Sequence, residues 1–255
     1  LAQRGHSVAF VSYSVPLRLG ELPPRVCFHE VAVEEYPLLK QFPYTLALAS
    51  KLAEVARSHR LRILHVHYAI PFAAAAILAK QIAPELDLKV VTTLHGTDIN
   101  LVGSNDSFQP VTAFCIEHSD AVTAVSHSLR AETDRVFGVK RPIEVISNFV
   151  DPADYVNARP AIWPGDDEVG ARGKKEPIMV HISNYRPVKR STDVVKIFAR
   201  VLTSMPARLL LIGEGPDLGQ VTDLAGELGI LNRVRLIGVV DDVAPYLRSA
   251  DLLIL

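Results

Sequence analysis

Strands that alternate with helices along the whole chain predict an α/β fold with two doubly wound, Rossmann-like halves. Three observations support this prediction. Short apolar runs rich in β-branched residues, typical of buried parallel strands, alternate with segments whose apolar residues recur at helical spacing. The alternation stops after Phe149 and starts again at Ile178. Several runs end abruptly in polar residues, as strands of open α/β sheets do where a ligand lies beyond their carboxyl ends.

The composition is that of a well-cored globular protein without a basic excess. The 255 residues suffice for two ordinary domains, with 49% hydrophobic residues, 22% charged residues and a net charge of −1. This balance argues against non-specific binding of nucleic acid, and no apolar run reaches the length that spans a membrane. Cys27 and Cys115 lie in apolar segments without metal-ligand spacing, so we predict reduced core thiols in a cytoplasmic protein.

The first half, residues 1–150, is predicted to form one Rossmann-like domain. Its expected strands cover residues 6–14, 26–33, 63–68, 89–95, 121–126 and 143–148. Its expected helices cover residues 44–59, an alanine-rich segment opened by Pro71, and residues 108–118 and 127–137. Ser126 is placed to cap the last of these helices.

The second half begins after a change in composition. Residues 151–177 hold four prolines, three glycines and many charges without periodicity, which predicts a linker or a surface excursion. Residues 178–255 then restart the pattern as a second Rossmann-like domain, and a ligand cleft is expected between two such halves. The expected strands are 178–184, 208–212, 234–240 and 252–255, and the expected helices are 191–204, 217–228 and 243–249.

The stretch VTTLHGTD marks the first candidate site. A buried strand ends there in hydroxyls, an imidazole, a glycine and a carboxylate, so Thr93, His95 and Asp98 could face a substrate. A strand followed by an ordinary polar turn would use the same residues, and this stretch alone does not separate the two readings.

Two turns in the second half predict contacts to an anion. Arg186, Lys189 and Arg190 lie between a strand and a helix, where cations and unpaired N–H groups suit a diphosphate. The alternative is a solvated basic turn. Gly213 and Gly215 form a glycine turn after the next strand, which would let the backbone approach a nucleotide, although a plain left-handed turn needs the same residues.

Histidines and other polar residues also end two strands of the first half. His65 and His67 share one face of a strand and could ligate a metal, but no third ligand is apparent; hydrogen-bonded core or cleft histidines are the alternative. Tyr68 and Asn148 stand at strand ends, where they can reach a ligand. The chain contains no G-x-S-x-G elbow, P-loop, HExxH or EF-hand motif.

Taken together, the motifs HVHYAIP, VTTLHGTDI, SDAVTAVSHSL, SNFVD, HISNYRPVKR and GEGP resemble glycosyltransferase family 4. The resemblance covers nearly the whole chain apart from residues 152–177, and it implies the GT-B fold. It is nearest to the branch of the family that transfers N-acetylglucosamine from UDP-N-acetylglucosamine to L-malate, with retention, as the first step of bacillithiol biosynthesis. The resemblance also implies no metal and no other cofactor.

The resemblance implies roles for individual residues on the donor side. Asn184 and Lys189 match the pair that approaches the donor diphosphate, with Arg186 and Arg190 as neighbours of less definite role. The other matching residues on the nucleotide side, placed at the glycine turn and beside the uracil, are Gly213, Gly215, Gly238 and Val240.

On the acceptor side, Tyr68 and Thr93 match groups that would hold malate, and Asn148 matches the same cleft. His95 matches the histidine beside the donor sugar, so His95 and Lys189 are the expected catalytic residues. Asp98 is expected to hold the loop rather than to contact substrate.

Two features of the family are not found in this sequence. Its glycine-rich loop would lie upstream of Leu1, and its E-x7-E carboxylates would lie beyond Leu255, so these 255 residues alone are expected to be inactive. A family 4 enzyme with another acceptor, such as an inositol phosphate or a lipid-linked sugar, remains an alternative, as does a non-catalytic nucleotide-sugar-binding module. No nucleic-acid or membrane partner is expected, and a homo-oligomer is left open.

Overall fold

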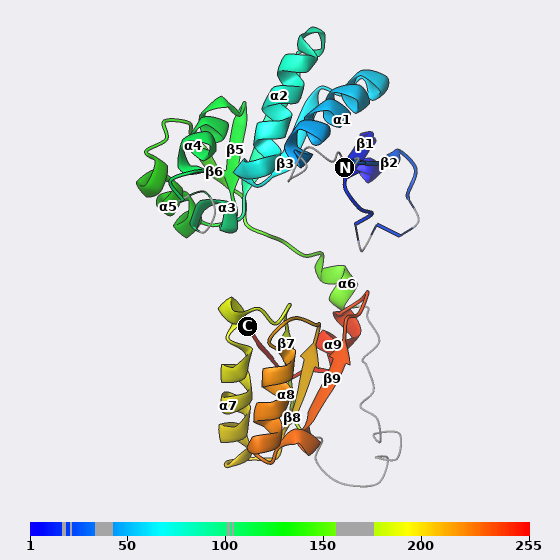
Figure 1. Cartoon of the computed structure of the whole chain (residues 1–255). Helices are drawn as coiled ribbons and strands as arrows, with labels where there is room; N and C mark the ends of the chain where they lie inside the picture. Colours follow the sequence, from blue (N-terminus) through cyan, green and yellow to red (C-terminus); the bar gives the residue numbers. More distant parts are fainter. Residues whose placement is uncertain (17–18, 21, 34–42, 101–102, 104, 157–175) are drawn as a thin grey trace. The chain divides into compact units, whose positions relative to one another are not determined.

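The computed structural model describes residues 1–16, 19–20, 22–33, 43–100, 103, 105–156 and 176–255 (Figure 1). They form two compact units, Leu1–Phe149 (unit 1) and Val150–Leu255 (unit 2). Within the described residues, no helix is both long and apolar enough to span a bilayer.

Parallel strands form the centre of unit 1. β1 (Val8–Ser12) pairs with β2 (Val26–Glu30) in a separate two-stranded sheet. The larger sheet runs in the order β3 (Ile63–His67), β4 (Lys89–Leu94), β5 (Ala121–Ala124) and β6 (Ile143–Val145). The predicted alternation along β3 is confirmed, since Leu64 and Val66 are buried in the core while His65 and His67 lie exposed on the other face.

Helices cover the sheets of unit 1. The described helices are η1 (Ala2–Arg4), α1 (Tyr44–His59), η2 (Ala69–Ala73), α2 (Ala74–Ile82), η3 (Pro84–Leu86), α3 (Thr97–Asn100), α4 (Gln109–His118) and α5 (His127–Phe137). The predicted cap of α5 is confirmed, because the Ser126 hydroxyl accepts a hydrogen bond from the Leu129 N–H at 3.1 Å. The helix expected from Pro71 is found as η2 followed by α2, whereas α3 and η3 were not predicted, because each is too short to show a periodic apolar pattern.

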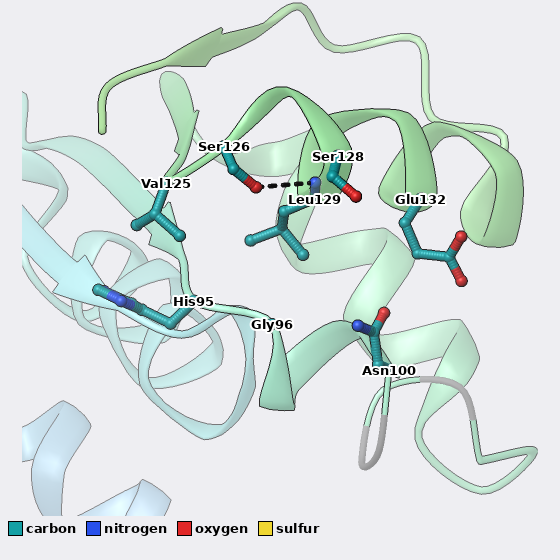
Figure 2. Close-up of a pocket in the computed structure, with 8 residues that line it drawn as sticks. All are labelled: His95, Gly96, Asn100, Val125, Ser126, Ser128, Leu129 and Glu132. Carbon is teal, nitrogen blue, oxygen red and sulfur yellow. Dashed lines mark hydrogen bonds between the residues drawn. The ribbon is translucent and has the colours of Figure 1, made fainter. Parts of the chain in front are cut away.

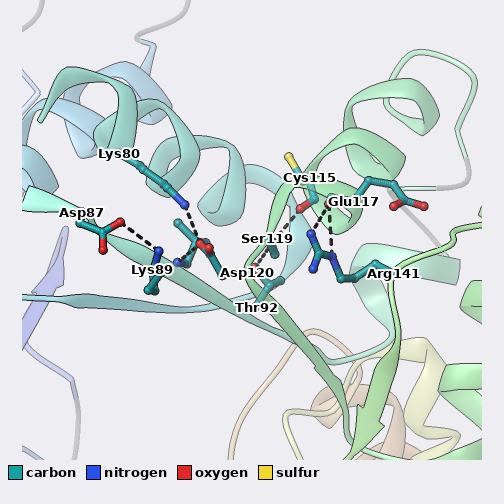
Figure 3. A network of polar contacts seen from close by, with 10 residues as sticks. Lys80, Asp87, Lys89, Thr92, Cys115, Glu117, Ser119, Asp120 and Arg141 are labelled. Carbon is teal, nitrogen blue, oxygen red and sulfur yellow. Dashed lines mark hydrogen bonds and ion pairs between the residues drawn. The ribbon is translucent and has the colours of Figure 1, made fainter. Parts of the chain in front are cut away.

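Charged and polar groups at the amino edge of the larger sheet bind one another (Figure 3). Asp120 accepts hydrogen bonds from the Lys80 ammonium at 2.7 Å and the Val90 N–H at 2.8 Å. Burial raises the pKa of the Asp120 carboxyl, but these two donors outweigh it and hold the pKa below its usual range. Next to it, the Thr92 and Ser119 hydroxyls lie 2.8 Å apart in the core. These polar groups at the amino edge are therefore hydrogen-bonded to one another.

Unit 2 holds one parallel sheet in the order β10 (Leu252–Ile254), β7 (Ile178–Ile182), β8 (Arg208–Ile212) and β9 (Val234–Gly238). Its described helices are α6 (Pro152–Val156), η5 (Pro187–Lys189), α7 (Ser191–Leu202), α8 (Leu218–Glu227), η6 (Leu231–Arg233) and α9 (Ala244–Ser249). Successive residues of β8 belong to separate apolar clusters, Leu209 and Leu211 to one and Leu210 and Ile212 to the other. Burial on both faces explains why this strand is a continuous apolar run.

Some predicted boundaries were wrong. The strand expected at 143–148 ends at Val145, because its neighbour β5 ends at Ala124 and offers its last acceptor to the Ile146 N–H. The strand expected at 234–240 ends at Gly238, whose φ of 78° leaves the extended region. The predicted linker begins with α6, where the Asp151 carboxylate accepts a hydrogen bond from the Ala153 N–H. Residues 157–175 of that linker lie outside the described residues.

Candidate active site

In unit 1 the HGTD turn is held by one buried carboxylate. Asp98 is 2% exposed, and its Oδ1 accepts hydrogen bonds from the N–H groups of His95 at 3.1 Å and Gly96 at 2.9 Å. Its Oδ2 accepts from the Ala69 N–H at 2.9 Å, in the segment after β3. Three backbone donors thus occupy three of the roughly four acceptor positions of a carboxylate that is buried, which agrees with the expectation that Asp98 holds the loop.

The Thr93 hydroxyl lies in a chain of hydrogen bonds across three strands. It is 2.8 Å from His65 Nε2 on β3 and 2.8 Å from Thr123 Oγ1 on β5. A hydroxyl offers one donor and two acceptor positions, so Thr93 keeps one position for a third partner. The two neighbouring strands thus hold the Thr93 side chain in place and leave its hydroxyl able to make one more hydrogen bond.

His67, His95 and Tyr68 form an aromatic cluster at the carboxyl edge. His67 Nδ1 lies 2.7 Å from His95 Nε2, which requires one nitrogen to donate and the other to accept. The ring centroids of Tyr68 and His95 are 5.0 Å apart. Partial burial lowers the pKa of His67, and the neighbouring His65 and His95 lower it further, which favours the neutral ring. The structure therefore brings together Tyr68, Thr93 and His95, the residues predicted for one side of the site.

A cavity of about 350 Å³ opens beside His95 (Figure 2). Its lining comes from the turn after β4, from α3 and from the first turns of α5, and comprises His95, Gly96, Asn100, Val125, Ser126, Ser128, Leu129 and Glu132. Apart from His95, none of these residues was predicted to lie at the site. The sequence predicts Ser126 only as a helix cap, and the polar first turn of α5 is the sequence signal for the cavity.

Asn148 is not brought into this cluster. It is exposed and lies three residues beyond the end of β6, in the segment that leads out of unit 1. Its predicted role stays a prediction.

In unit 2 the glycine turn and the segment after β7 pack against each other. A Cβ on Gly213 would collide with the Ser183 carbonyl oxygen, and a Cβ on Gly215 with the Asn184 carbonyl oxygen. Both positions therefore require glycine because the two backbones touch. The Tyr185 carbonyl also accepts a hydrogen bond from the Asp217 N–H at 2.9 Å.

The end of β9 joins the same group of turns. The Gly213 N–H donates to the Gly238 carbonyl at 2.7 Å, and Val240 lies half-buried two residues further on. Asn184, Gly213, Gly215 and Gly238, which the sequence predicted for the nucleotide side, therefore meet at the carboxyl edge of one sheet.

The three cations near this edge differ in their surroundings. Arg186, Lys189 and Arg190 are all exposed. Arg190 is paired with the Asp193 carboxylate at 2.6 Å, and of the three it alone has an ion-pair partner among the described residues. Lys189 ends the η5 turn just before α7, where an anion would find both a cation and helix N–H groups.

The buried residues beneath this edge were not predicted. His181 is 1% exposed; its Nδ1 lies 3.0 Å from the Ile254 carbonyl and its Nε2 3.2 Å from the Ser191 hydroxyl. The carbonyl can only accept, so Nδ1 donates to it, and Nε2 shares a hydrogen bond with the Ser191 hydroxyl. The ring thus ties the start of α7 to β10. Its place inside an apolar run gave no signal beyond that of a core histidine.

The sequence patterns of two known families match this chain. That of Glycosyltransferase Family 4 matches residues 1–154, and that of Glycosyl transferases group 1 matches residues 166–255. Together they cover both units.

The chain is also similar to individual proteins. It is 46% identical over all 255 residues to the N-acetyl-alpha-D-glucosaminyl L-malate synthase of Bacillus anthracis, and it spans 66%, about two thirds, of that protein's length.

Two solved structures are similar in fold. A glycosyltransferase from Rickettsia africae has a TM-score of 0.69 at 18% identity, covering 99% of this chain and 65% of its own. Anabaena Alr3699/HepE in complex with UDP-glucose has a TM-score of 0.66 at 17% identity, covering 97% and 72%. At such identities the likeness shows the fold alone, and the predicted GT-B fold with Rossmann-like domains is confirmed.

Proposed function

Because this chain belongs to glycosyltransferase family 4, we propose that its protein transfers N-acetylglucosamine from UDP-N-acetylglucosamine to the hydroxyl of L-malate. The transfer retains the anomeric configuration and is the first step of bacillithiol biosynthesis. The observation that carries the choice of substrates is the 46% identity, over every residue of this chain, to a protein named for that reaction. A cytoplasmic location and a homo-oligomeric state stay predictions.

The carboxyl edge of unit 1 is suited to a small anionic acceptor. The first turn of α5 lines the cavity beside His95, and N–H groups at a helix start favour an anion such as a malate carboxylate. Glu132 in the same lining would repel that anion, but its carboxylate is bound by Arg135 at 2.6 Å. Tyr68 and the remaining position of Thr93 supply hydrogen bonds for the acceptor.

The carboxyl edge of unit 2 is suited to a nucleoside diphosphate. The bare backbone at Gly213 and Gly215 lets a ligand approach closely, as in other nucleotide-binding turns. Of the three exposed cations at this edge, Lys189 and Arg186 have no ion-pair partner among the described residues, so they can neutralise phosphate oxygens.

These groups suggest how the transfer proceeds. Lys189 stabilises the negative charge that develops on the leaving diphosphate, and a positioned cation of this kind contributes about 3–4 kcal/mol in a closed site. His95 contacts the donor sugar, and its ring is kept in one orientation by His67. The leaving diphosphate takes the proton from the malate hydroxyl on the same face of the sugar, which accounts for retention. With these cations at the diphosphate, we propose that the step needs no metal ion.

The test uses the protein in the full length that its gene encodes. It is incubated with UDP-N-acetylglucosamine and L-malate, and UDP and glycosylated malate are measured by mass spectrometry. Succinate, which lacks the hydroxyl, is the matched control and should give no product. Product from an inositol phosphate or a lipid-linked sugar, but not from malate, would assign a different acceptor. If the protein binds UDP-N-acetylglucosamine but transfers the sugar to no acceptor, the proposed transfer is wrong and the protein is a non-catalytic nucleotide-sugar-binding module.

A further inference from the structure

A thiol and two imidazoles meet in unit 1, apart from the residues proposed for the transfer. We propose that Cys27, His29 and His59 form a zinc-binding site. Their ligand atoms all lie within 4.8 Å of one another, and the Cys27 Sγ is 3.4 Å from His29 Nε2. Within the described part of the chain this is the one group of three or more His, Cys, Asp or Glu residues with such spacing.

The geometry is close to that of a zinc centre. Zn–S bonds of about 2.3 Å and Zn–N bonds of about 2.0–2.1 Å, arranged tetrahedrally, put neighbouring ligand atoms roughly 3.3–3.6 Å apart. The Cys27–His29 distance already falls in this range, and the ring centroids of His29 and His59 are 4.9 Å apart. Small rotations of the His59 side chain would complete the set, and His59 is exposed and ends its helix.

The backbone supports all three ligands. Cys27 and His29 are two residues apart on β2, so they share one face of the strand. His59 is the last residue of α1. A metal ion would therefore tie an edge strand of the two-stranded sheet to the end of a helix. Because His59 is exposed, the fourth tetrahedral position faces solvent and would be filled by water.

The charged side chains that act on His29, Lys51 and Glu54, leave room for a cation. Lys51 opposes a cation, but its ammonium is paired with the Glu54 carboxylate at 3.0 Å. A thiolate with two imidazoles is a donor set that suits zinc.

The alternative is an ordinary core thiol, as the sequence predicted. The Cys27 thiol lies 3.7 Å from the Val8 carbonyl and can donate to it without any metal. The spacing gave no sign of a site, because His59 lies 30 residues from His29 and joins it only through packing. Metal titration separates the two readings.

The experiment titrates the tag-free protein with Co²⁺ and then displaces it with Zn²⁺. We expect one ion per chain and the charge-transfer absorption of a thiolate–cobalt bond. Cys27→Ser should abolish that absorption, and His59→Gln should weaken zinc binding at least about 100-fold, since even outer-shell partners are worth roughly 10–100-fold. His118→Gln, another exposed histidine of unit 1, should bind zinc as the parent does.

His59→Gln keeps the test decisive if Cys27→Ser fails to fold, because an exposed helix-terminal residue can change without loss of the core. Absence of stoichiometric binding by the parent protein would overturn the proposal. So would binding that His59→Gln leaves unchanged, or that His118→Gln weakens as much.

Discussion

The carboxyl edges of the two four-stranded sheets differ in the groups that form them. In unit 1 side chains form the edge: His67 hydrogen-bonds to His95, the Tyr68 ring packs at a tilt beside His95, and Thr93 joins three strands. In unit 2 the backbone forms it: the turn at residues 213–215 presses against the carbonyls of residues 183–184. One edge presents a specific set of rings and hydroxyls, and the other presents bare peptide groups with cations beside them.

Because of this difference, the two edges are suited to different parts of the substrates. Backbone N–H groups and cations suit the diphosphate of a nucleoside diphosphate sugar, whereas side chains can be exchanged to suit one acceptor. Substitutions should therefore act differently at the carboxyl edge of unit 1 (the side-chain edge) and at that of unit 2 (the backbone edge). At the backbone edge, activity or stability should fall when a substitution adds atoms or removes a charge. At the side-chain edge, they should fall when a substitution loosens the turn that carries His95.

The largest expected effect is the loss of Lys189, one of the two cations at the backbone edge without an ion-pair partner among the described residues. Lys189→Ala should lower turnover about 10²–10³-fold, because one positioned charge at the leaving group is worth that much in a closed site. The fold should survive, since Lys189 is exposed and ends a short turn. Steady-state release of UDP by the gene-encoded full-length protein measures the effect.

Arg190→Ala is the matched control, because Arg190 is already bound to the Asp193 carboxylate at 2.6 Å. It should lower turnover far less than Lys189→Ala. Equal losses in the two variants, or a near-normal rate for Lys189→Ala, would remove Lys189 from the diphosphate site.

The next effect comes from adding one methyl group at the same edge. Gly215→Ala would drive a Cβ into the Asn184 carbonyl oxygen, and forcing packed backbones apart costs about 1–3 kcal/mol. We expect a lower midpoint of unfolding in urea and a higher KM for the donor. Gly219→Ala is the control, since a Cβ there meets no atom within 4 Å and alanine favours the helix α8. An equal loss in both variants would show that the packing at Gly215 has no special role.

The order of strands and helices was predictable because burial imposes a visible period on the sequence. The role of Asp98 was predictable for a related reason, since a carboxylate three residues after His95 can reach the N–H groups of its own turn. Strand ends were less predictable: Ile146 continues the apolar run of β6, but the neighbouring strand β5 ends at Ala124, so the residues beyond Ile146 have no partner strand.

Contacts between distant segments could not be predicted from spacing. The 2.7 Å contact of His67 with His95 depends on the β3–β4 register, which pairs His67 with Thr93. The cavity beside α5 and the cluster of Cys27, His29 and His59 likewise arise from packing between elements. A single sequence contains no record of such pairings.

At the side-chain edge, the largest effect is expected at Asp98, the buried residue that holds the HGTD turn. Asp98→Asn replaces one acceptor oxygen by an NH₂ group that faces a backbone N–H, and a buried donor left unsatisfied costs about 1–3 kcal/mol. We expect lower stability to urea together with weaker acceptor binding, because the turn lines the cavity proposed for the acceptor. Asp87→Asn, whose side chain is 85% exposed in a surface pair with Lys89, should change both quantities little. Full stability in Asp98→Asn would contradict the proposed support of the turn.

The smallest expected effect is a pH dependence of the side-chain edge. Partial burial lowers the pKa values of His65 and His67 in the folded protein below the ordinary value of 6.5. The unfolded chain therefore binds more protons once the pH falls below about 6.5, so the free energy of unfolding is highest above this pH and declines below it. The decline levels off below the folded pKa values.

The His67 contribution should stay under about 1 kcal/mol, because the ring is open to solvent that screens its neighbours. Urea unfolding of unit 1 at a series of pH values between 7.5 and about 5 measures it. His67→Gln should flatten the decline, whereas His127→Gln, at the exposed start of α5, should leave it unchanged. A stability that rises as the pH falls would mean that the histidine cluster prefers to be charged. In that case the His67–His95 contact would hold an extra proton between the two rings, and the side-chain edge would carry a positive charge, as the edge of unit 2 does.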